Sequence, residues 1–155
     1  MAVIFEKGNL LDADTHYICH QVNCRGKMVS GVTEQIRQKW PIVYTEYFDF
    51  FLSSLGGLLG EIQIVDLPKE ENKIQQTVIN MFAQQSYGYD GNLYTSYDAF
   101  WSCLQKIKNF VPFGQSIAFP YKIGCGLGGA NWEVIYKMIE VTFSHHIVKI
   151  YCLED

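Results

Sequence analysis

The sequence predicts one α/β domain, in which a mixed, mostly parallel sheet carries helices on both of its faces. Strand-like and helix-like segments alternate along the chain, with no internal repeat and no linker between them. A length of 155 residues is typical of a single domain with a substantial core. The hydrophobic share of 48% and the charged share of 18% are typical of a folded globular protein. These observations predict a single domain over residues 1–155.

The first half of the chain contains two expected strands and two expected helices. Residues 2–5 are a short apolar strand, and residues 17–23 are a second strand, rich in β-forming side chains. A helix over residues 31–39 ends before Pro41, because proline disfavours helical geometry in the residue before it. Residues 42–55 carry aromatic side chains at helical spacing and predict a second helix that ends at a glycine pair.

The second half continues the alternation. Two apolar strands over residues 62–67 and 76–82 flank a charged turn. Thr95 is expected to cap a helix over residues 96–109, with Asp98 near its third position completing a loose capping box. The remaining expected elements are a strand, a helix and a final strand, over residues 115–119, 131–144 and 147–152.

The most informative segment is the loop IGCGLGG, residues 123–129, which holds four glycines in six residues between a strand and a helix. Bare main-chain amides beside the positive end of a helix dipole suit a phosphate or diphosphate. A tight turn without a ligand is the alternative. Residues 23–27 also follow a strand, and ligands of such sheets bind beyond the carboxyl ends of the strands. The two loops are therefore expected to meet over one cleft.

Composition narrows the class of partner and the compartment. The net charge is −4 and no run of Lys or Arg forms a basic stripe, so nucleic acid is not expected as the main partner. A small anionic ligand is compatible with this charge. No apolar stretch approaches the ~20 residues of a membrane span, and the N-terminus has no signal-peptide pattern. Five cysteines without a CxxC pair predict a reducing cytoplasm.

Four segments carry a resemblance to a known family. In order and spacing, residues 7–11, 18–23, 26–32 and 118–132 resemble a macro domain over nearly the whole chain. The resemblance is to the compact branch with terminal ADP-ribose glycohydrolases and ADP-ribose-1''-phosphate phosphatases. It implies a three-layer α/β/α fold that binds ADP-ribose without a metal or other cofactor.

The resemblance also implies a set of site residues. Asn9 would accept from the adenine amino group, Asn23 would contact the distal ribose, and Gly31 would let the backbone approach the diphosphate. A turn residue and a strand-ending asparagine bonded to its own backbone are the alternatives for the two asparagines. The expected substrate-binding residues are Asn9, Leu10, Gly31, Val32, Pro120, Lys122, Ile123, Gly124, Cys125, Gly126, Leu127 and Gly128.

The expected catalytic residues are His20 and Asn23, which would position a water molecule together with the loop backbone. The imidazole of His20 can also exchange protons near neutral pH. A packed core histidine is the alternative for His20. A zinc site with His16, Cys19, His20 and Cys24 is rejected, since their spacing has no CxxC or helical HxxxH pattern and neighbours on a strand point to opposite faces. Cys125 has no identifiable partner base in the sequence.

The chain departs from the family at two catalytic positions. Glycohydrolases of this branch use a lysine just after the strand that here ends near Phe82, and an aspartate where this chain has Gly128. Three hypotheses follow: a hydrolase of ADP-ribose derivatives, a non-catalytic reader of ADP-ribose, and a vestigial cleft. The hydrolase is favoured, with a 1''-phosphate or an ADP-ribosyl bond as its target. The expected partner is ADP-ribose or a macromolecule that carries it, nucleic acid included, and the expected state is a monomer. Aromatic residues 87–97 are expected to stack on the adenine, to cover the cleft or to pack against the neighbouring helix.

Overall fold

The computed structural model describes residues 3–153 and contains one six-stranded sheet, with the order β1-β6-β5-β2-β4-β3. Its strands are β1 (Val3–Lys7), β2 (Tyr17–Asn23), β3 (Ile62–Asp66), β4 (Thr77–Gln84), β5 (Ser116–Pro120) and β6 (Ile147–Cys152). Each neighbouring pair is parallel except β3 and β4, which pair antiparallel. The prediction of a mixed, mostly parallel sheet is confirmed.

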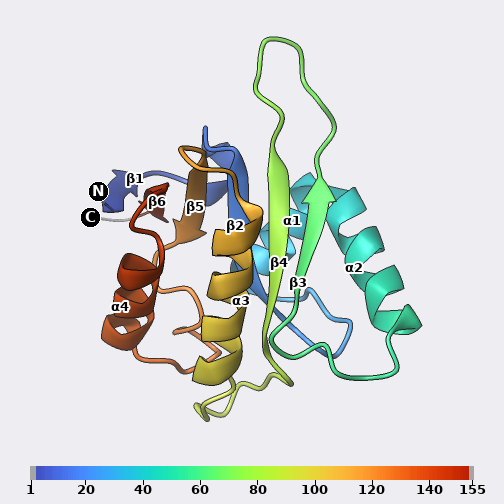
Figure 1. The fold of residues 1–155 in the computed structure, drawn as a ribbon. Helices are drawn as coiled ribbons and strands as arrows, with labels where there is room; N and C mark the ends of the chain where they lie inside the picture. The colour runs from blue at the N-terminus through green and yellow to red at the C-terminus, as the bar shows by residue number, and fades with distance from the viewer. Residues whose placement is uncertain (1–2, 154–155) are drawn as a thin grey trace.

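Helices cover both faces of this sheet (Figure 1). They are α1 (Gly31–Lys39), α2 (Pro41–Ser53), α3 (Tyr97–Phe110) and α4 (Trp132–Thr142), with a 3-10 turn η1 (Leu10–Asp12). One core lies between the sheet and α3 with α4, and a second core lies between the sheet and α1 with α2. The three-layer α/β/α arrangement is therefore confirmed.

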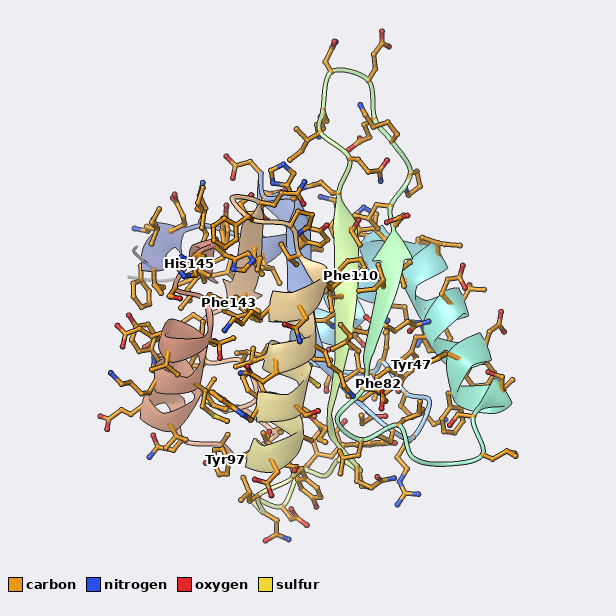
Figure 2. All side chains as sticks on the ribbon, in the orientation of Figure 1. Tyr47, Phe82, Tyr97, Phe110, Phe143 and His145 are labelled. Atoms are coloured by element: carbon orange, nitrogen blue, oxygen red, sulfur yellow. The ribbon has the colours of Figure 1, made fainter. Side chains whose placement is uncertain are left out.

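Strand periodicity builds the two cores. In β4, Ile79 and Met81 belong to the core under α3, whereas Val78 and Phe82 belong to the core under α2. This alternation follows from the two-residue period of a strand. The rings of Phe82 and Tyr47 stack with centroids 5.7 Å apart, and Figure 2 shows them together between the sheet and α2. A strand buried on both faces is thus held between two aromatic and aliphatic layers.

Several element ends differ from the sequence prediction. The strand predicted at residues 2–5 runs from Val3 to Lys7, and its predicted first residue lies outside the described residues. Helix α2 begins one residue early, because Pro41 suits the first helical position. It ends at Ser53, since Ser54 has an extended backbone conformation. β4 continues two residues further than predicted, to Gln84.

The cap of α3 is a correction. Ser96, not Thr95, accepts the capping bond, which the Ala99 amide donates over 3.1 Å. The Thr95 hydroxyl donates instead to the Gly124 carbonyl, 2.8 Å away in the glycine loop. Both residue types cap helices well, so only the tertiary contact with the loop distinguishes them.

The carboxyl ends of the parallel strands all lie on the same side of the sheet, which we call its carboxyl edge. The hairpin between β3 and β4, residues 67–76, projects from the opposite edge (Figure 1). Loops 24–30 and 121–131 and the segment 85–96 follow β2, β5 and β4, so they gather at the carboxyl edge. Among residues 3–153, no helix combines the length and the apolar character that a membrane crossing requires.

Candidate functional site

Three adjoining pockets form one cleft at the carboxyl edge of the sheet. We call them the outer, central and inner pockets; their volumes are about 510, 240 and 60 Å³. The outer and central pockets share Val32, Pro120, Tyr121 and Lys122. The central and inner pockets share Gln21, Ser30, Thr33, Gln84 and Leu127. Because adjacent pockets share walls, they make a continuous elongated groove.

Most of the site residues expected from the sequence line this cleft. Asn9 and Leu10 lie in the outer pocket, and Asn23 lies in the inner pocket. The central pocket brings His20 and the start of α1 together with the glycine loop. Its expected residues are His20, Gly31, Val32, Pro120, Lys122, Ile123, Gly124, Gly126, Leu127 and Gly128. Cys125 is the exception, since it lines none of the three pockets.

The start of α1 presents main-chain donors to the central pocket. Gly31 adopts a positive φ of 59°, which glycine tolerates readily. The Ser30 side chain makes no capping hydrogen bond, so the first amides of the helix stay available. The helix dipole adds positive potential at the same point. This wall of the pocket therefore suits an anionic group.

The glycine loop presents donors from the opposite wall. Its internal hydrogen bonds use the amides of Cys125, Gly129 and Ala130. Within residues 3–153, no acceptor pairs with the amides of Gly126, Leu127 or Gly128. Two segments with unpaired amides thus line one central pocket, which is the arrangement expected for a bound phosphate or diphosphate.

The glycines of the loop serve different purposes. A Cβ atom at Gly128 would lie 2.5 Å from the Gly124 carbonyl oxygen and 2.5 Å from Thr95 Oγ1, so close packing requires glycine there. A Cβ atom at Gly126 would meet nothing within 4 Å. Close packing therefore does not require glycine at position 126, which lines the central pocket.

A chain of side-chain hydrogen bonds anchors the loop to the sheet. The Gln21 amide nitrogen Nε2 donates to Thr95 Oγ1 and to Gln84 Oε1, each over 2.8 Å. Thr95 in turn donates to the Gly124 carbonyl, also over 2.8 Å. Sequence reasoning missed Gln21 and Gln84, whose only signal is their position at or near the ends of neighbouring strands.

His20 is held inside the sheet rather than offered to a ligand. Its ring nitrogen Nε2 pairs with Asn80 Oδ1, and Nδ1 lies 3.2 Å from Thr33 Oγ1. Burial lowers the pKa of His20 to about 4, and the bond to Asn80 opposes this shift. The imidazole is therefore neutral at pH 7 with both nitrogens engaged. This geometry favours a structural role, and the proton-transfer role stays a prediction.

The two asparagines also make local hydrogen bonds. Asn9 Oδ1 accepts from the Leu11 amide over 2.9 Å and caps the 3-10 turn η1, which leaves its second lone pair for a ligand. Asn23 Oδ1 accepts from the Arg25 amide and from the Tyr47 hydroxyl, at 2.9 and 3.0 Å. Asn23 Oδ1 therefore has no acceptor site left for a ligand. This agrees with the alternative given for Asn23, a strand-ending asparagine that bonds to nearby backbone.

The Cys125 thiol is turned into its own loop. Its Sγ donates to the Ile123 carbonyl over 3.4 Å. Burial raises the pKa of Cys125 to about 11, although the charge of Lys122 acts in the opposite direction. A protonated thiol that bonds to the backbone is a poor nucleophile. Within the described part of the chain, no three His, Cys, Asp or Glu side chains are grouped to hold a metal ion.

The charge of the cleft is opposite to that of the chain. Lys122 lines the outer and central pockets and Lys27 lines the inner pocket. Among residues 3–153, no Asp or Glu lines any of the three. A chain with a net charge of −4 therefore presents a cationic groove.

Another hollow lies beside the hairpin 67–76, on the side of the sheet opposite to its carboxyl edge. This hollow, of about 470 Å³, is lined by side chains of both charges, including Asp12, Lys39, Glu70 and Lys73. Lys39 and Asp12 pair at 3.6 Å. It lies away from the carboxyl ends of the parallel strands, where ligands of such sheets bind, so the three-pocket cleft is the candidate site.

Solved structures with the same architecture are known. The macrodomain of Mycobacterium tuberculosis DarG aligns with a TM-score of 0.81 and 22% identity, covering 97% of each chain. The chain has the macrodomain fold. Thermosipho africanus DarTG, solved in complex with ADP-ribose, aligns with a TM-score of 0.80 and 17% identity, covering 99% of this chain and 42% of that one. The macrodomain fold expected from the sequence is confirmed.

Two curated mycobacterial proteins are similar to the chain in sequence. The chain is 25% identical over 141 residues to a DNA ADP-ribosyl glycohydrolase from Mycobacterium tuberculosis and to one from Mycobacterium bovis. The alignment covers 91% of this chain and 38% of those proteins, so the chain spans about two fifths of the length of the curated relatives it matches. No protein-family model matches the sequence.

Proposed function

We propose that the cleft binds ADP-ribose. The observation that carries this proposal is the pair of facing amide sets, from the start of α1 and from Gly126 to Gly128, across the central pocket. A diphosphate carries two negative charges and several acceptor oxygens, and this donor arrangement matches both. The outer and inner pockets extend the groove on either side, as a nucleoside and a second sugar require.

The ligand is proposed to lie in one direction along the groove. The adenosine occupies the larger outer pocket, where the free lone pair of Asn9 Oδ1 accepts from the adenine amino group. The neutral amide makes a weaker bond than a carboxylate would. Lys122 contributes positive charge between the outer and central pockets. The distal ribose then lies at the junction of the central and inner pockets.

We further propose that the domain hydrolyses ADP-ribose derivatives at the distal ribose. The bond cleaved joins that sugar to a 1''-phosphate or to an ADP-ribosylated macromolecule. The name of the mycobacterial relatives supports a macromolecular substrate, with DNA as one form of it. The amides of the loop would orient the substrate and stabilise charge that develops on its oxygens.

A reader of ADP-ribose without activity is the second candidate, because specific observations favour it. His20 is neutral and has both nitrogens engaged. Position 128 has no room for a side chain, and the end of β4 carries Gln84. The described cleft therefore offers binding groups more readily than a proton donor.

Two experiments test these proposals in order. Calorimetric titration with ADP-ribose in the absence of metal should show binding in the micromolar range. An absence of heat and of competition at millimolar ligand would exclude both candidates. A panel of ADP-ribose-1''-phosphate, an ADP-ribosylated oligonucleotide and an ADP-ribosylated peptide then separates a hydrolase from a reader, since a reader binds without releasing product.

The setting of the protein is proposed on separate grounds. The thiols of Cys19, Cys24 and Cys103 are free and buried. We infer a reducing cytoplasmic compartment and a monomeric domain. Light scattering at micromolar concentration should give the mass of one chain, and a doubled mass would contradict the monomer.

A further inference from the structure

The junction of the central and inner pockets is occupied by a carboxamide that sequence reasoning missed. Gln84 is the last residue of β4, pairs in register with Asn23 of β2, and lines both pockets. It is half-buried. The wall at the point where the groove narrows therefore includes the Gln84 side chain.

The hydrogen bonds of Gln84 leave it able to bind a ligand. Its Oε1 accepts from Gln21 Nε2 over 2.8 Å, and its Nε2 donates to the Ser86 carbonyl over 2.8 Å. A carboxamide has two acceptor lone pairs and two donor hydrogens. One acceptor site on Oε1 and one donor hydrogen on Nε2 of Gln84 remain, both on the same planar group. That combination matches two neighbouring sugar hydroxyls, one donating and one accepting.

Asn23 does not keep this capacity. Its Oδ1 accepts from the Arg25 amide and shares the Tyr47 hydroxyl, while its Nδ2 donates to the Lys27 carbonyl over 3.0 Å. It retains one donor hydrogen and no free acceptor site. A diol needs both a donor and an acceptor for bidentate recognition, so Gln84 suits it better than Asn23.

The position of Gln84 is tied to the loop that faces the diphosphate. Gln21 bridges Gln84 and Thr95, and Thr95 bonds to the Gly124 carbonyl, each step measuring 2.8 Å. Three consecutive hydrogen bonds thus link the junction to the glycine loop. The link fixes the spacing between the amides that face the central pocket and the free edge of Gln84.

We propose that Gln84 is the residue that binds the hydroxyl pair of the distal ribose, and that Gln21 and Thr95 are positioning residues for it. The inference rests on the proposed binding of ADP-ribose and names the group that reads its second sugar. Gln84 then distinguishes a nucleoside diphosphate that carries a pentose from one that does not.

The test compares ADP-ribose with ADP, which lacks the distal ribose, by calorimetry. The variant Gln84→Met keeps the length of the side chain and removes both polar groups. The matched control is Gln85→Met, because Gln85 is the exposed neighbour and lines none of the three pockets. Gln84→Met should weaken ADP-ribose binding about tenfold, as the loss of one or two ligand hydrogen bonds predicts, and leave ADP binding within about twofold. Gln85→Met should change neither.

The outcomes separate this inference from the proposal on which it rests. If the wild type binds neither nucleotide, the proposed function fails. If it binds both and Gln84→Met keeps the wild-type ratio of the two affinities, the assignment of Gln84 is overturned and the proposed function stands. Equal wild-type affinities for ADP and ADP-ribose would overturn it as well. Gln84→Asn, shorter by one methylene, repeats the test should the methionine variant unfold on heating earlier than the control.

Discussion

The two sides of the central pocket are built from different materials. The start of α1 and the glycine loop present main-chain amides that have no partner among the described residues. The ends of β2 and β4 present His20, Gln21 and Gln84, whose side chains mainly bond to one another or to their neighbours. The first side is open for a ligand, whereas the second is largely self-satisfied. Ligand affinity should therefore depend on the main-chain amides. Sugar recognition should depend on the few hydrogen-bond donors and acceptors of the side chains that remain unused.

The largest expected effect comes from closing the amide side. Gly126→Glu places a carboxylate where a Cβ meets nothing within 4 Å, so the fold accepts it while the charge faces the diphosphate. Repulsion of about 4 kcal/mol predicts a loss of affinity for ADP-ribose of about a thousandfold. Gly126→Ala is the control and should bind within a few-fold of wild type. Equal affinity of the glutamate variant, measured by calorimetry, would contradict the role of this loop.

The next largest effect is on the pH dependence of stability, through the protonation of His20. The pKa of His20 is about 4 in the folded chain, and about 6.5 is usual in an unfolded one. Between these values the unfolded chain binds the extra proton, so stability is full above pH 6.5 and falls as the pH approaches 4. The loss reaches roughly 3 kcal/mol.

Urea unfolding at several pH values checks this dependence. The wild type should lose more stability between pH 6.5 and 4 than His20→Gln does, because glutamine keeps hydrogen-bonding capacity without titrating. Parallel losses in the two proteins would show that His20 carries no such shift.

The link between the two sides gives a smaller effect. Thr95→Val leaves the Gly124 carbonyl and a Gln21 amide hydrogen without their partners, at a cost of about 2 kcal/mol in the free energy of unfolding. It should also weaken ADP-ribose binding, because the loop loses its anchor. Ser96→Ala removes the helix cap for about 1 kcal/mol and should leave affinity unchanged. If Ser96→Ala weakened ADP-ribose binding and Thr95→Val did not, Thr95 would be assigned as the helix cap instead of Ser96.

The smallest effect is expected at Cys125. Its thiol has a pKa raised to about 11 and lines none of the three pockets. Cys125→Ala should change affinity and any turnover by less than about twofold, and iodoacetamide should modify the wild type slowly at pH 7. Abolished turnover in the alanine variant would reveal a nucleophile that the geometry does not indicate.

The sequence was sufficient for the elements and for the open side of the cleft. β2 and β6 have the predicted bounds, since runs of β-forming residues end at polar ones. The glycine loop can be recognised from the sequence because its amide donors belong to the main chain and do not depend on a distant side chain. Local patterns therefore locate both the strands and the anion-binding donors.

The hydrogen bonds among the side chains at the ends of β2 and β4 could not be predicted from the sequence. Gln21 and Gln84 are 63 residues apart, and Gln21 and Thr95 are 74 apart, so their hydrogen bonds depend on the order of the strands. The engagement of His20 by Asn80, 60 residues away, has the same origin. Tertiary contacts also decided between Thr95 and Ser96 as the cap of α3.

The central claim is that unpaired amides of two segments hold the diphosphate, and amide chemical shifts test it most directly. Titration of the ¹⁵N-labelled protein with ADP-ribose should move the signals of Val32, Gly126, Leu127 and Gly128 more than those elsewhere. Shifts concentrated instead at Asn72 and Lys73, in the hollow beside the hairpin, would contradict the account.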